Sequence, residues 1–182
     1  GADLPAARHH RLRRLAARTL EMSEAFVRAA DARDRVLYRR PWAAAELAEE
    51  AAAELRVQAE AAGVALQVQS DDDPTPLNVD RELVIRALGN LLSNAIRHSP
   101  RGGQVLLRAH RDDGRWQFTV RDHGKGLSAE QRERLAGGVG LRAQHAGGVG
   151  LGLLFVQRVA RRHGGTLGAR EPDDGPGALF EL

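Results

Sequence analysis

The first pattern along the chain is a run of mostly apolar positions at helical spacing. Between residues 12 and 26 these positions alternate in steps of three and four, as in the seam of a coiled coil or a four-helix bundle. The run covers only about two heptads, so an amphipathic helix packed on its own domain explains it equally well. We predict one long N-terminal helix and a domain boundary between segments 1–33 and 34–182. The seam positions are Leu12, Leu15, Thr19, Met22 and Phe26.

Beyond residue 34, helical and strand-like stretches alternate. Gly63 closes an Ala/Glu/Leu-rich helix, Asp80 is the predicted N-cap of a second helix, and Ser128 with Gln131 forms a capping box. Two pairs of predicted strands, 105–110 with 116–122 and 166–171 with 178–182, are joined as hairpins. Helices mixed with mostly antiparallel strands predict an α+β fold, a two-layer sandwich of helices on a mixed, mostly antiparallel sheet. The predicted helices are 42–62, 80–99, 151–163 and a short one after Ser128, and the predicted strands are 36–38, 64–68, 105–110, 116–122, 166–171 and 178–182.

Composition narrows the class of protein. Hydrophobic residues make up 42% of the 182 positions, which is enough for one compact domain with a core and one extra element. The chain has no cysteine, and this removes disulfide frameworks, zinc ribbons and thiol catalysis. No apolar run approaches the ~20 residues of a membrane span. A net charge of +3 is weak evidence for nucleic acid, so we expect no nucleic-acid partner.

One face of the helix predicted at 80–99 is polar and carries candidate chemistry. At about 100° per residue its leucines and isoleucines share one side, and Asn90, Asn94 and Arg97 form a stripe on the other. An amide oxygen suits Mg²⁺ without cancelling the charge that phosphate must supply, and arginine pairs with phosphate oxygens. The alternative is a solvent-exposed polar face with no ligand.

A second candidate follows the strand predicted at 116–122. Asp122 continues the alternation of that strand, so its carboxylate should point to the buried side, where it needs a hydrogen-bond donor. Gly124 and Gly126 follow at once, and residues without a Cβ let a ligand approach the backbone. An adenine amino group is one candidate donor. The alternative, that Asp122 only braces a tight turn, is equally open.

The third candidate is the glycine-rich stretch 137–150, which we read as a loop, together with the helix that follows it. Free amides and the positive end of a helix make the stretch Gly147-Gly148-Val149-Gly150-Leu151-Gly152 a plausible phosphate cradle. Such loops are weakly specific, and the Walker-type GxxxxGK[ST] motif is absent. No acidic residue stands where a dinucleotide-binding fold would need one.

Together, in this order and spacing, the three motifs resemble those of the Bergerat-fold ATP-binding proteins (the GHKL superfamily), and most closely the sensor histidine kinases. The segment 90–100 is similar to their N box, 122–126 to the first glycine box and 148–153 to the second. The resemblance covers residues 35–182 and implies a Bergerat-type sandwich with ATP and Mg²⁺ as cofactors. It also implies that segment 1–33 is the C-terminal part of a dimerisation and phosphotransfer helical bundle.

The resemblance implies roles for particular residues. Asn94 would ligate Mg²⁺, Asn90 and Arg97 would hold phosphates, and His98 would sit beside the nucleotide. Asp122 would accept the adenine amino hydrogen, and residues 128–147 would form a lid. The remaining nucleotide-binding positions would be Gly124, Gly126, Gly148, Gly150, Leu151 and Gly152.

The residue at position 90 separates the subfamilies. Hydrolysing relatives carry a glutamate there as the general base for water, whereas Asn90 cannot accept a proton at neutral pH. We therefore expect a histidine kinase that transfers the γ-phosphate to a histidine of its dimerisation domain. His9 and His10 lack the acid and the proline that mark that acceptor, so we read them as exposed positions. Alone, the chain should bind ATP without autophosphorylating.

The same resemblance implies partners and leaves alternatives. We expect a homodimer in the full-length protein, a response regulator as its partner, and a cytoplasmic domain of a membrane-anchored sensor. The segment Gly177-Ala178-Leu179-Phe180 stands where the family often has a Ser-Thr pair, which removes a hydroxyl that supports the adenine site. The alternatives are a serine kinase of the anti-sigma-factor type and a nucleotide-binding regulatory module without transfer activity.

Overall fold

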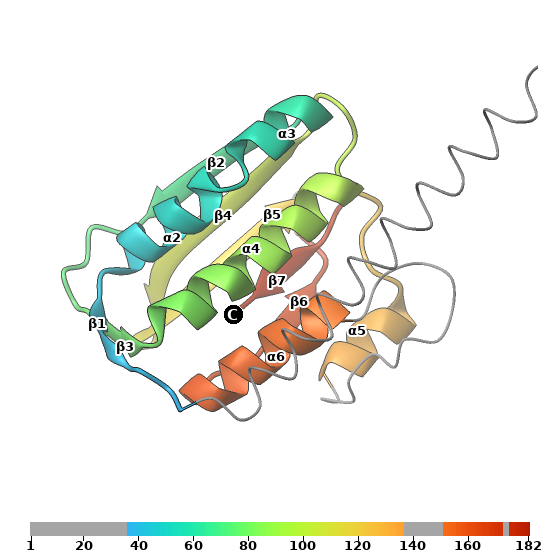
Figure 1. Ribbon diagram of the computed structural model, residues 1–182. Coiled ribbons are helices and arrows are strands. Elements are labelled where there is room, and N and C mark those ends of the chain that lie inside the picture. The colour runs from blue at the N-terminus through green and yellow to red at the C-terminus, as the bar shows by residue number, and fades with distance from the viewer. Residues whose placement is uncertain (1–35, 137–150, 173–174) are drawn as a thin grey trace, which may run out of the picture.

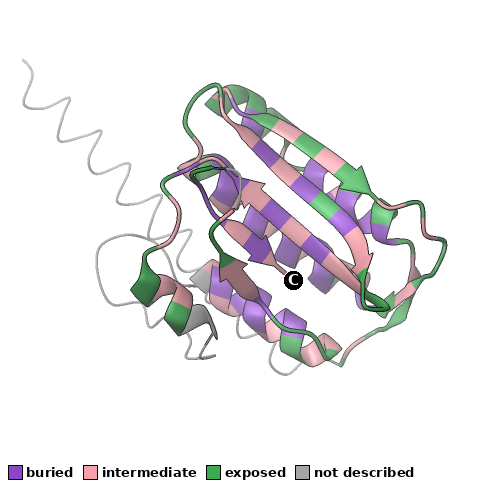
Figure 2. Ribbon diagram, turned by 180° about the vertical axis from the view of Figure 1, so that it is seen from behind, coloured by how far each residue is buried: buried purple, intermediate pink, exposed green. Residues whose placement is uncertain are grey.

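A mixed sheet covered by helices on one face forms the body of the protein. The computed structural model describes residues 36–136, 151–172 and 175–182. The helix predicted within residues 1–33, the boundary that follows it and the loop predicted at 137–150 lie outside the described residues. Within them, the α+β prediction is confirmed: Figures 1 and 2 show a layer of helices packed on one face of a layer of strands.

The sheet has five strands in the order β2-β4-β5-β7-β6. Strand β2 runs parallel to β4, and every other pair is antiparallel, as the sequence predicted. Asp113 (φ 48°) and Gly114 (φ 77°) form the tight turn between β4 and β5, with the positive φ values that such hairpins favour. The strands are β2 (Ala65–Ser70), β4 (Gln104–Asp112), β5 (Arg115–Asp122), β6 (Gly168–Arg170) and β7 (Leu179–Glu181).

Helix α4 (Arg81–His98) runs through the middle of the helical layer. Its first turn is capped by Asp80, whose Oδ1 accepts the N–H of Leu83 at 3.3 Å, as predicted. Its apolar side is almost fully buried between the sheet and the helices beside it, α2 (Ala44–Ala53) and α6 (Leu151–His163). The opposite, polar side of α4 is not covered in this way, so its side chains are the ones open to a ligand.

The prediction of a strand at 36–38 was wrong. That segment is irregular, and the strand is β1 (Arg40–Trp42), which pairs antiparallel with β3 (Leu77–Val79), a strand that the sequence did not predict. The backbone N–H of Tyr38 donates to Asp80 Oδ2 at 3.1 Å, so a side chain takes the bond that a neighbouring strand would have supplied. Pro41 is tolerated because a two-stranded ribbon leaves one edge of β1 unpaired.

The predicted helix 42–62 is broken into α2 and α3 (Arg56–Ala62). The break lies at Leu55, whose N–H donates to Ala52 O at 3.0 Å, one residue closer than in an α-helix. No glycine or proline marks it, so the sequence carried no signal. Leu55 packs against the core and Ala59 is buried, which keeps both halves on the sheet. The predicted end at Gly63 is confirmed, with φ 69°.

A junction of buried polar groups joins the start of α4 to the end of α6. The N–H of Asp80 donates to His163 Nε2 at 3.0 Å, and His163 Nδ1 lies 2.8 Å from Val159 O, so the ring is neutral with its proton on Nδ1. Burial lowers the pKa of His163 from its ordinary 6.5. Arg39 donates to the carbonyl of Arg162.

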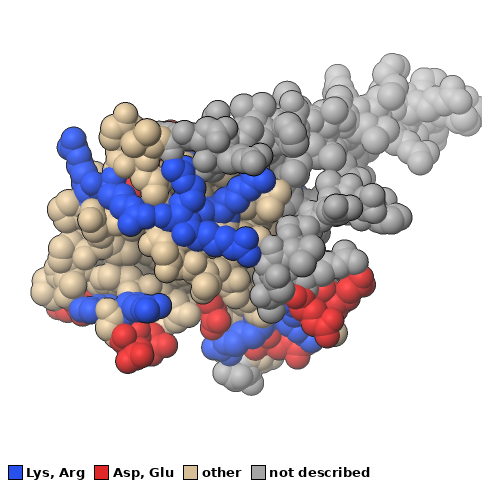
Figure 3. Space-filling model, turned by 90° about the horizontal axis from the view of Figure 1, so that it is seen from below, with Lys and Arg blue, Asp and Glu red and all other residues tan. Residues whose placement is uncertain are grey.

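Basic side chains gather on the face of the domain seen from below (Figure 3), which is the side where α6 lies in Figure 1.

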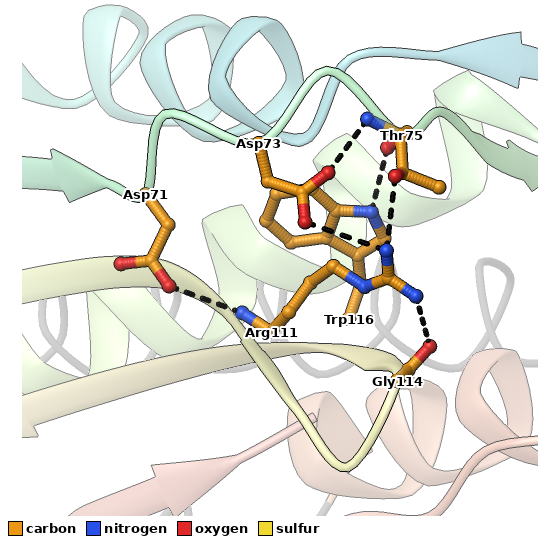
Figure 4. Close-up of polar contacts among 6 residues, drawn as sticks. All are labelled: Asp71, Asp73, Thr75, Arg111, Gly114 and Trp116. Atoms are coloured by element: carbon orange, nitrogen blue, oxygen red, sulfur yellow. Dashed lines mark hydrogen bonds and ion pairs between the residues drawn. The ribbon is translucent and has the colours of Figure 1, made fainter.

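A cluster of polar contacts holds the loop between β2 and β3 against the β4–β5 turn (Figure 4). Arg111 donates to Asp73 at 3.3 Å, to Thr75 Oγ1 at 2.9 Å and to Gly114 O, and the Trp116 indole N–H donates to Thr75 O at 2.8 Å. Hydrogen bonds from Thr75 and the charge of Arg111 lower the pKa of Asp73. Trp116 and the motif that begins at Asp122 lie at opposite ends of β5, so this cluster stabilises the end of the sheet away from the candidate site.

Candidate functional site

Three segments far apart in the sequence meet beside the C-terminal half of α4. A Cβ on Gly124, in the turn after β5, would stand 2.5 Å from the carbonyl oxygen of His98 at the end of α4. A Cβ on Gly152, in the first turn of α6, would stand 3.3 Å from Asn90 Oδ1. The structure therefore places the 122–126 turn at the end of α4 and Gly152 of the third motif beside Asn90. Gly148 and Gly150 lie outside the described residues, and Leu151 is described only as the first residue of α6.

Asn90 is half-buried, with its amide group fixed from one side. Its Nδ2 donates to the carbonyl of Arg86 one turn earlier, at 2.9 Å. That bond leaves Oδ1 directed toward the start of α6, where the absence of a Cβ on Gly152 makes room for it. The side chain of Arg86 extends toward α6 as well, with its guanidinium 5.8 Å from the centre of the Phe155 ring. The sequence motifs assigned no role to Arg86.

Asn94 and Arg97 bind each other. Arg97 donates to Asn94 Oδ1 at 2.8 Å, so the oxygen expected to hold Mg²⁺ accepts an arginine in this structure. The contact is exposed and spans one helical turn, and such pairs stabilise a helix by only about 0.2–0.5 kcal/mol. A divalent cation that replaced Arg97 at this oxygen would therefore break a weak interaction. It would also release the guanidinium to bind an anion.

Asp122 is buried at the end of β5, with 3% of its surface exposed. Its Oδ1 accepts the N–H of Gly124 at 2.8 Å and the N–H of Ala178 at 3.2 Å. In the described part of the chain both side-chain hydrogen bonds end on Oδ1, so Oδ2 keeps its acceptor capacity. The bracing role is therefore confirmed at Oδ1. The role as an acceptor for a ligand stays a prediction, for which Oδ2 is available.

The glycines of the turn serve the protein's own backbone. A Cβ on Gly124 would overlap the His98 carbonyl, and a Cβ on Gly126 (φ 72°) would stand 2.7 Å from the carbonyl oxygen of Gly177. Sequence reasoning explained these glycines by the approach of a ligand and missed the contact with Gly177. The Gly-Pro-Gly stretch at 175–177 was the available signal, since it marks a turn, but no local pattern indicates what that turn packs against.

His98 closes the site at the end of α4. Burial lowers the pKa of His98 from its ordinary 6.5, the charge of Arg97 acts in the same direction, the Asp122 carboxylate opposes it, and Lys125 lowers the pKa further. The ring is therefore neutral at physiological pH and offers a polar, uncharged surface beside Asp122. Lys125, the only lysine of the chain, is exposed in the 122–126 turn.

The donor set of this region suits a nucleotide better than a bare metal ion. In the described ranges, no group of three His, Asp or Glu side chains could hold a metal. The candidate ligand atoms are amide oxygens, an arginine, a buried carboxylate oxygen and the N-terminal end of α6, whose free N–H groups favour an anion. Such a set needs phosphate oxygens to complete a cation site, and it can hold an amino-bearing base at the other end.

Comparison with known proteins identifies the family. The sequence profile of the histidine kinase-, DNA gyrase B- and HSP90-like ATPases matches residues 79–182. Histidine protein kinase DivJ of Caulobacter vibrioides is 41% identical over 119 residues, which cover 62% of this chain and 19% of DivJ. The chain spans about a fifth of the length of the curated relatives that it matches first.

Solved structures share the fold. Full-length ShkA, in complex with AMPPNP, has a TM-score of 0.76 at 25% identity, over 97% of this chain and 37% of that one. Histidine kinase ThkA, in complex with response regulator protein TrrA, has a TM-score of 0.70 at 17% identity, over 100% of this chain and 50% of that one. With the three motifs gathered around α4, the chain belongs to the histidine kinase-, DNA gyrase B- and HSP90-like ATPases, and it carries the ATP-binding catalytic domain of two-component sensor histidine kinases.

Proposed function

We propose that this domain binds Mg²⁺-ATP between α4, the 122–126 turn and the start of α6, and gives the γ-phosphate to a histidine of the dimerisation helices in the full-length protein. The observation that carries the proposal is a buried carboxylate, Asp122, in a turn that packs against the end of α4, the helix that carries the amides Asn90 and Asn94. These two features are suited to the two ends of one ligand, an adenine base and a chain of phosphates.

At the base end, Asp122 Oδ2 accepts a hydrogen from the adenine 6-amino group. A buried carboxylate with one oxygen satisfied by two backbone amides is held in one orientation, so the second oxygen is a fixed acceptor. Neutral His98 lies beside the base. Gly124 and Gly126 let the turn that carries Asp122 pack close to α4 and to the loop before β7, which holds the carboxylate in place.

At the phosphate end, Asn94 Oδ1 would hold Mg²⁺, and Arg97, released from Asn94, would pair with a phosphate oxygen. Bound Mg²⁺ would supply neutralisation of phosphate charge. Asn90 on α4 and Gly152 in the first turn of α6 would contact the phosphates, and the resemblance adds Gly148, Gly150 and Leu151 as nucleotide-binding positions. The residues fit the ion because the arginine contact that occupies Asn94 is exposed and weak.

Position 90 favours transfer over hydrolysis. An amide cannot take a proton from water, and the Asn90 amide is already bonded to the carbonyl of Arg86. The accepting histidine belongs to the dimerisation domain, whose C-terminal part we assign to residues 1–33. His9 and His10 lie outside the described residues and remain predicted to be exposed positions without acceptor chemistry.

We propose that the full-length protein is a homodimer that passes phosphate to a response regulator. Histidine kinase ThkA, which shares the fold, is in complex with response regulator protein TrrA in its solved structure. We propose a cytoplasmic location for the domain within a membrane-anchored sensor. Among the described residues, every helix is too short or too polar to cross a membrane.

The test of nucleotide binding is calorimetric titration of the chain with Mg²⁺ and AMPPNP. Asp122→Ala and Asn94→Ala should each weaken binding by at least about tenfold, because each removes a direct ligand contact. Asp112→Ala, an exposed carboxylate at the far end of β4, is the matched control and should bind like wild type. Wild-type affinity in both site variants would overturn the site assignment.

The test of transfer adds the upstream helix that carries the acceptor and follows label from γ-labelled ATP. Label on the protein that is labile to acid and stable to base identifies phosphohistidine and supports the proposal. Acid-stable label would instead identify a serine kinase of the anti-sigma-factor type. Binding without any label would identify a regulatory module.

A further inference from the structure

Gly177, in the loop before β7, makes the closest backbone approach among the glycines of the described residues. Its φ is 133°, and a Cβ built on it would stand 1.9 Å from the carbonyl oxygen of Asp122, 2.8 Å from the carbonyl carbon of Asp122 and 3.2 Å from the Cα of His123. No side chain fits in that space. Position 177 therefore requires glycine for two independent reasons, its backbone angle and its contact with Asp122.

The approach of Gly177 delivers the next residue to the carboxylate. Ala178 donates its N–H to Asp122 Oδ1 at 3.2 Å and accepts the N–H of Asp122 at 3.0 Å. On the other side, the carbonyl oxygen of Gly177 lies 2.7 Å from the Cβ position of Gly126. The loop before β7 is thus packed against both ends of the 122–126 turn, and its position depends on glycines at 126 and 177.

We infer that Gly177 is a positioning residue for base recognition, which acts by holding the Ala178 N–H on Asp122 Oδ1 so that Oδ2 points at the adenine amino group. The inference rests on the proposed function, since it assigns a device within the same site. Alanine at 178 has no hydroxyl to offer, so a backbone amide is the donor that Ala178 supplies to the carboxylate. That donor is in reach only while position 177 has no side chain.

The chain offers a matched control two residues away. Gly175 lies in the same loop with φ 139°, but a Cβ on it would meet nothing within 4 Å. Gly175→Ala and Gly177→Ala therefore impose the same kind of backbone strain, and only the second forces the loop away from Asp122. The difference between the two variants isolates the contact with Asp122 from the strain.

The experiment measures AMPPNP and GMPPNP affinity with Mg²⁺ by calorimetry, at a temperature where circular dichroism shows all variants folded. Gly177→Ala should bind AMPPNP about tenfold or more weakly than Gly175→Ala. GMPPNP, which has a carbonyl at the corresponding ring position, should bind both variants alike. In the Asp122→Ala background, Gly177→Ala should have little further effect, because the carboxylate through which it acts is gone.

Equal AMPPNP affinity in the two glycine variants, while wild type binds AMPPNP, overturns this inference and leaves the proposed function intact. Failure of wild type to bind AMPPNP overturns both. If Gly177→Ala does not fold, wild-type ¹⁵N spectra decide: the Ala178 amide resonance should shift on saturation with Mg²⁺-AMPPNP, and an unshifted resonance overturns the inference.

Discussion

Asn90 in α4 and Gly152 in α6 face each other, with Asn90 Oδ1 3.3 Å from the position of a Cβ on Gly152. That spacing is tighter than most Cβ contacts in proteins, so position 152 accepts a side chain only if Asn90 moves by a few tenths of an ångström. The first motif of the site therefore constrains the third, although they are separated by some sixty residues. The amide and the glycine act as one unit.

The first prediction concerns this contact. Gly152→Ala should weaken binding of Mg²⁺-AMPPNP by less than about tenfold, because it displaces Asn90 slightly, and a small displacement of a positioning group has a limited effect. Adenosine, which lacks phosphates, should bind with unchanged affinity. Calorimetry with both ligands checks the prediction, and an equal loss for adenosine would place the effect at the base rather than at the phosphates.

The second prediction uses the glycine that precedes Asn90. Gly89 lies inside α4, and a Cβ on it would meet nothing within 4 Å. Gly89→Ala should raise the free energy of unfolding by about 0.5–1 kcal/mol, because alanine loses less backbone entropy in a helix than glycine does. Urea denaturation measures the change. Nucleotide affinity should match wild type, which makes this variant the control for Gly152→Ala.

The third prediction concerns the general base. Asn90→Glu should raise the rate of Mg²⁺-ATP hydrolysis by the isolated chain by at least about tenfold, since a carboxylate accepts a proton from water and an amide does not. Asn90→Gln has the same length without the charge and should leave the rate at its wild-type level. Steady-state phosphate release measures both. A rate that rises equally in the two variants would show that side-chain length, rather than basicity, limits hydrolysis.

The fourth prediction concerns pH and the junction at His163. Burial lowers the pKa of this ring in the folded state, so near pH 6 the unfolded chain binds more protons than the folded one. The free energy of unfolding should therefore fall as pH decreases through the ordinary pKa of 6.5 toward the lower folded pKa. It should reach its full value again above pH 6.5. Protonation also removes the acceptor for the N–H of Asp80.

Denaturation of wild type and His163→Gln between about pH 5 and 8 tests this, because glutamine keeps an acceptor and does not titrate there. The variant should lose part of the pH dependence. The part that remains is assigned to His98, whose pKa burial also lowers, and the double variant His98→Gln/His163→Gln should be flatter still. An unchanged profile in His163→Gln would contradict the assignment.

Much of the fold followed from local pattern. Asp80 was recognisable as an N-cap because capping joins residues three apart, and Asp113-Gly114 as a turn because its φ angles are a property of those two residues. Asp122 was recognisable as buried because the alternation of β5 continues through it. These features need no knowledge of what lies across the domain.

The remaining features depend on distant partners. The backbone N–H of Tyr38 donates to Asp80, 42 residues away, in place of the predicted strand pairing. His163 accepts the N–H of Asp80 across 83 residues. The importance of Gly177 comes from a backbone atom of Asp122, which no spacing along the chain reveals. The candidate site residues were named from sequence motifs and stay predictions, whereas the contacts that orient them could not be named from the sequence.

The junction at Asp80 has a mechanical consequence. Helix α4 has 18 residues, which at 1.5 Å per residue makes a rod of about 27 Å, and Asp80 at its start contacts both Tyr38 and His163. One residue therefore holds together the segment before β1, the start of α4 and the end of α6.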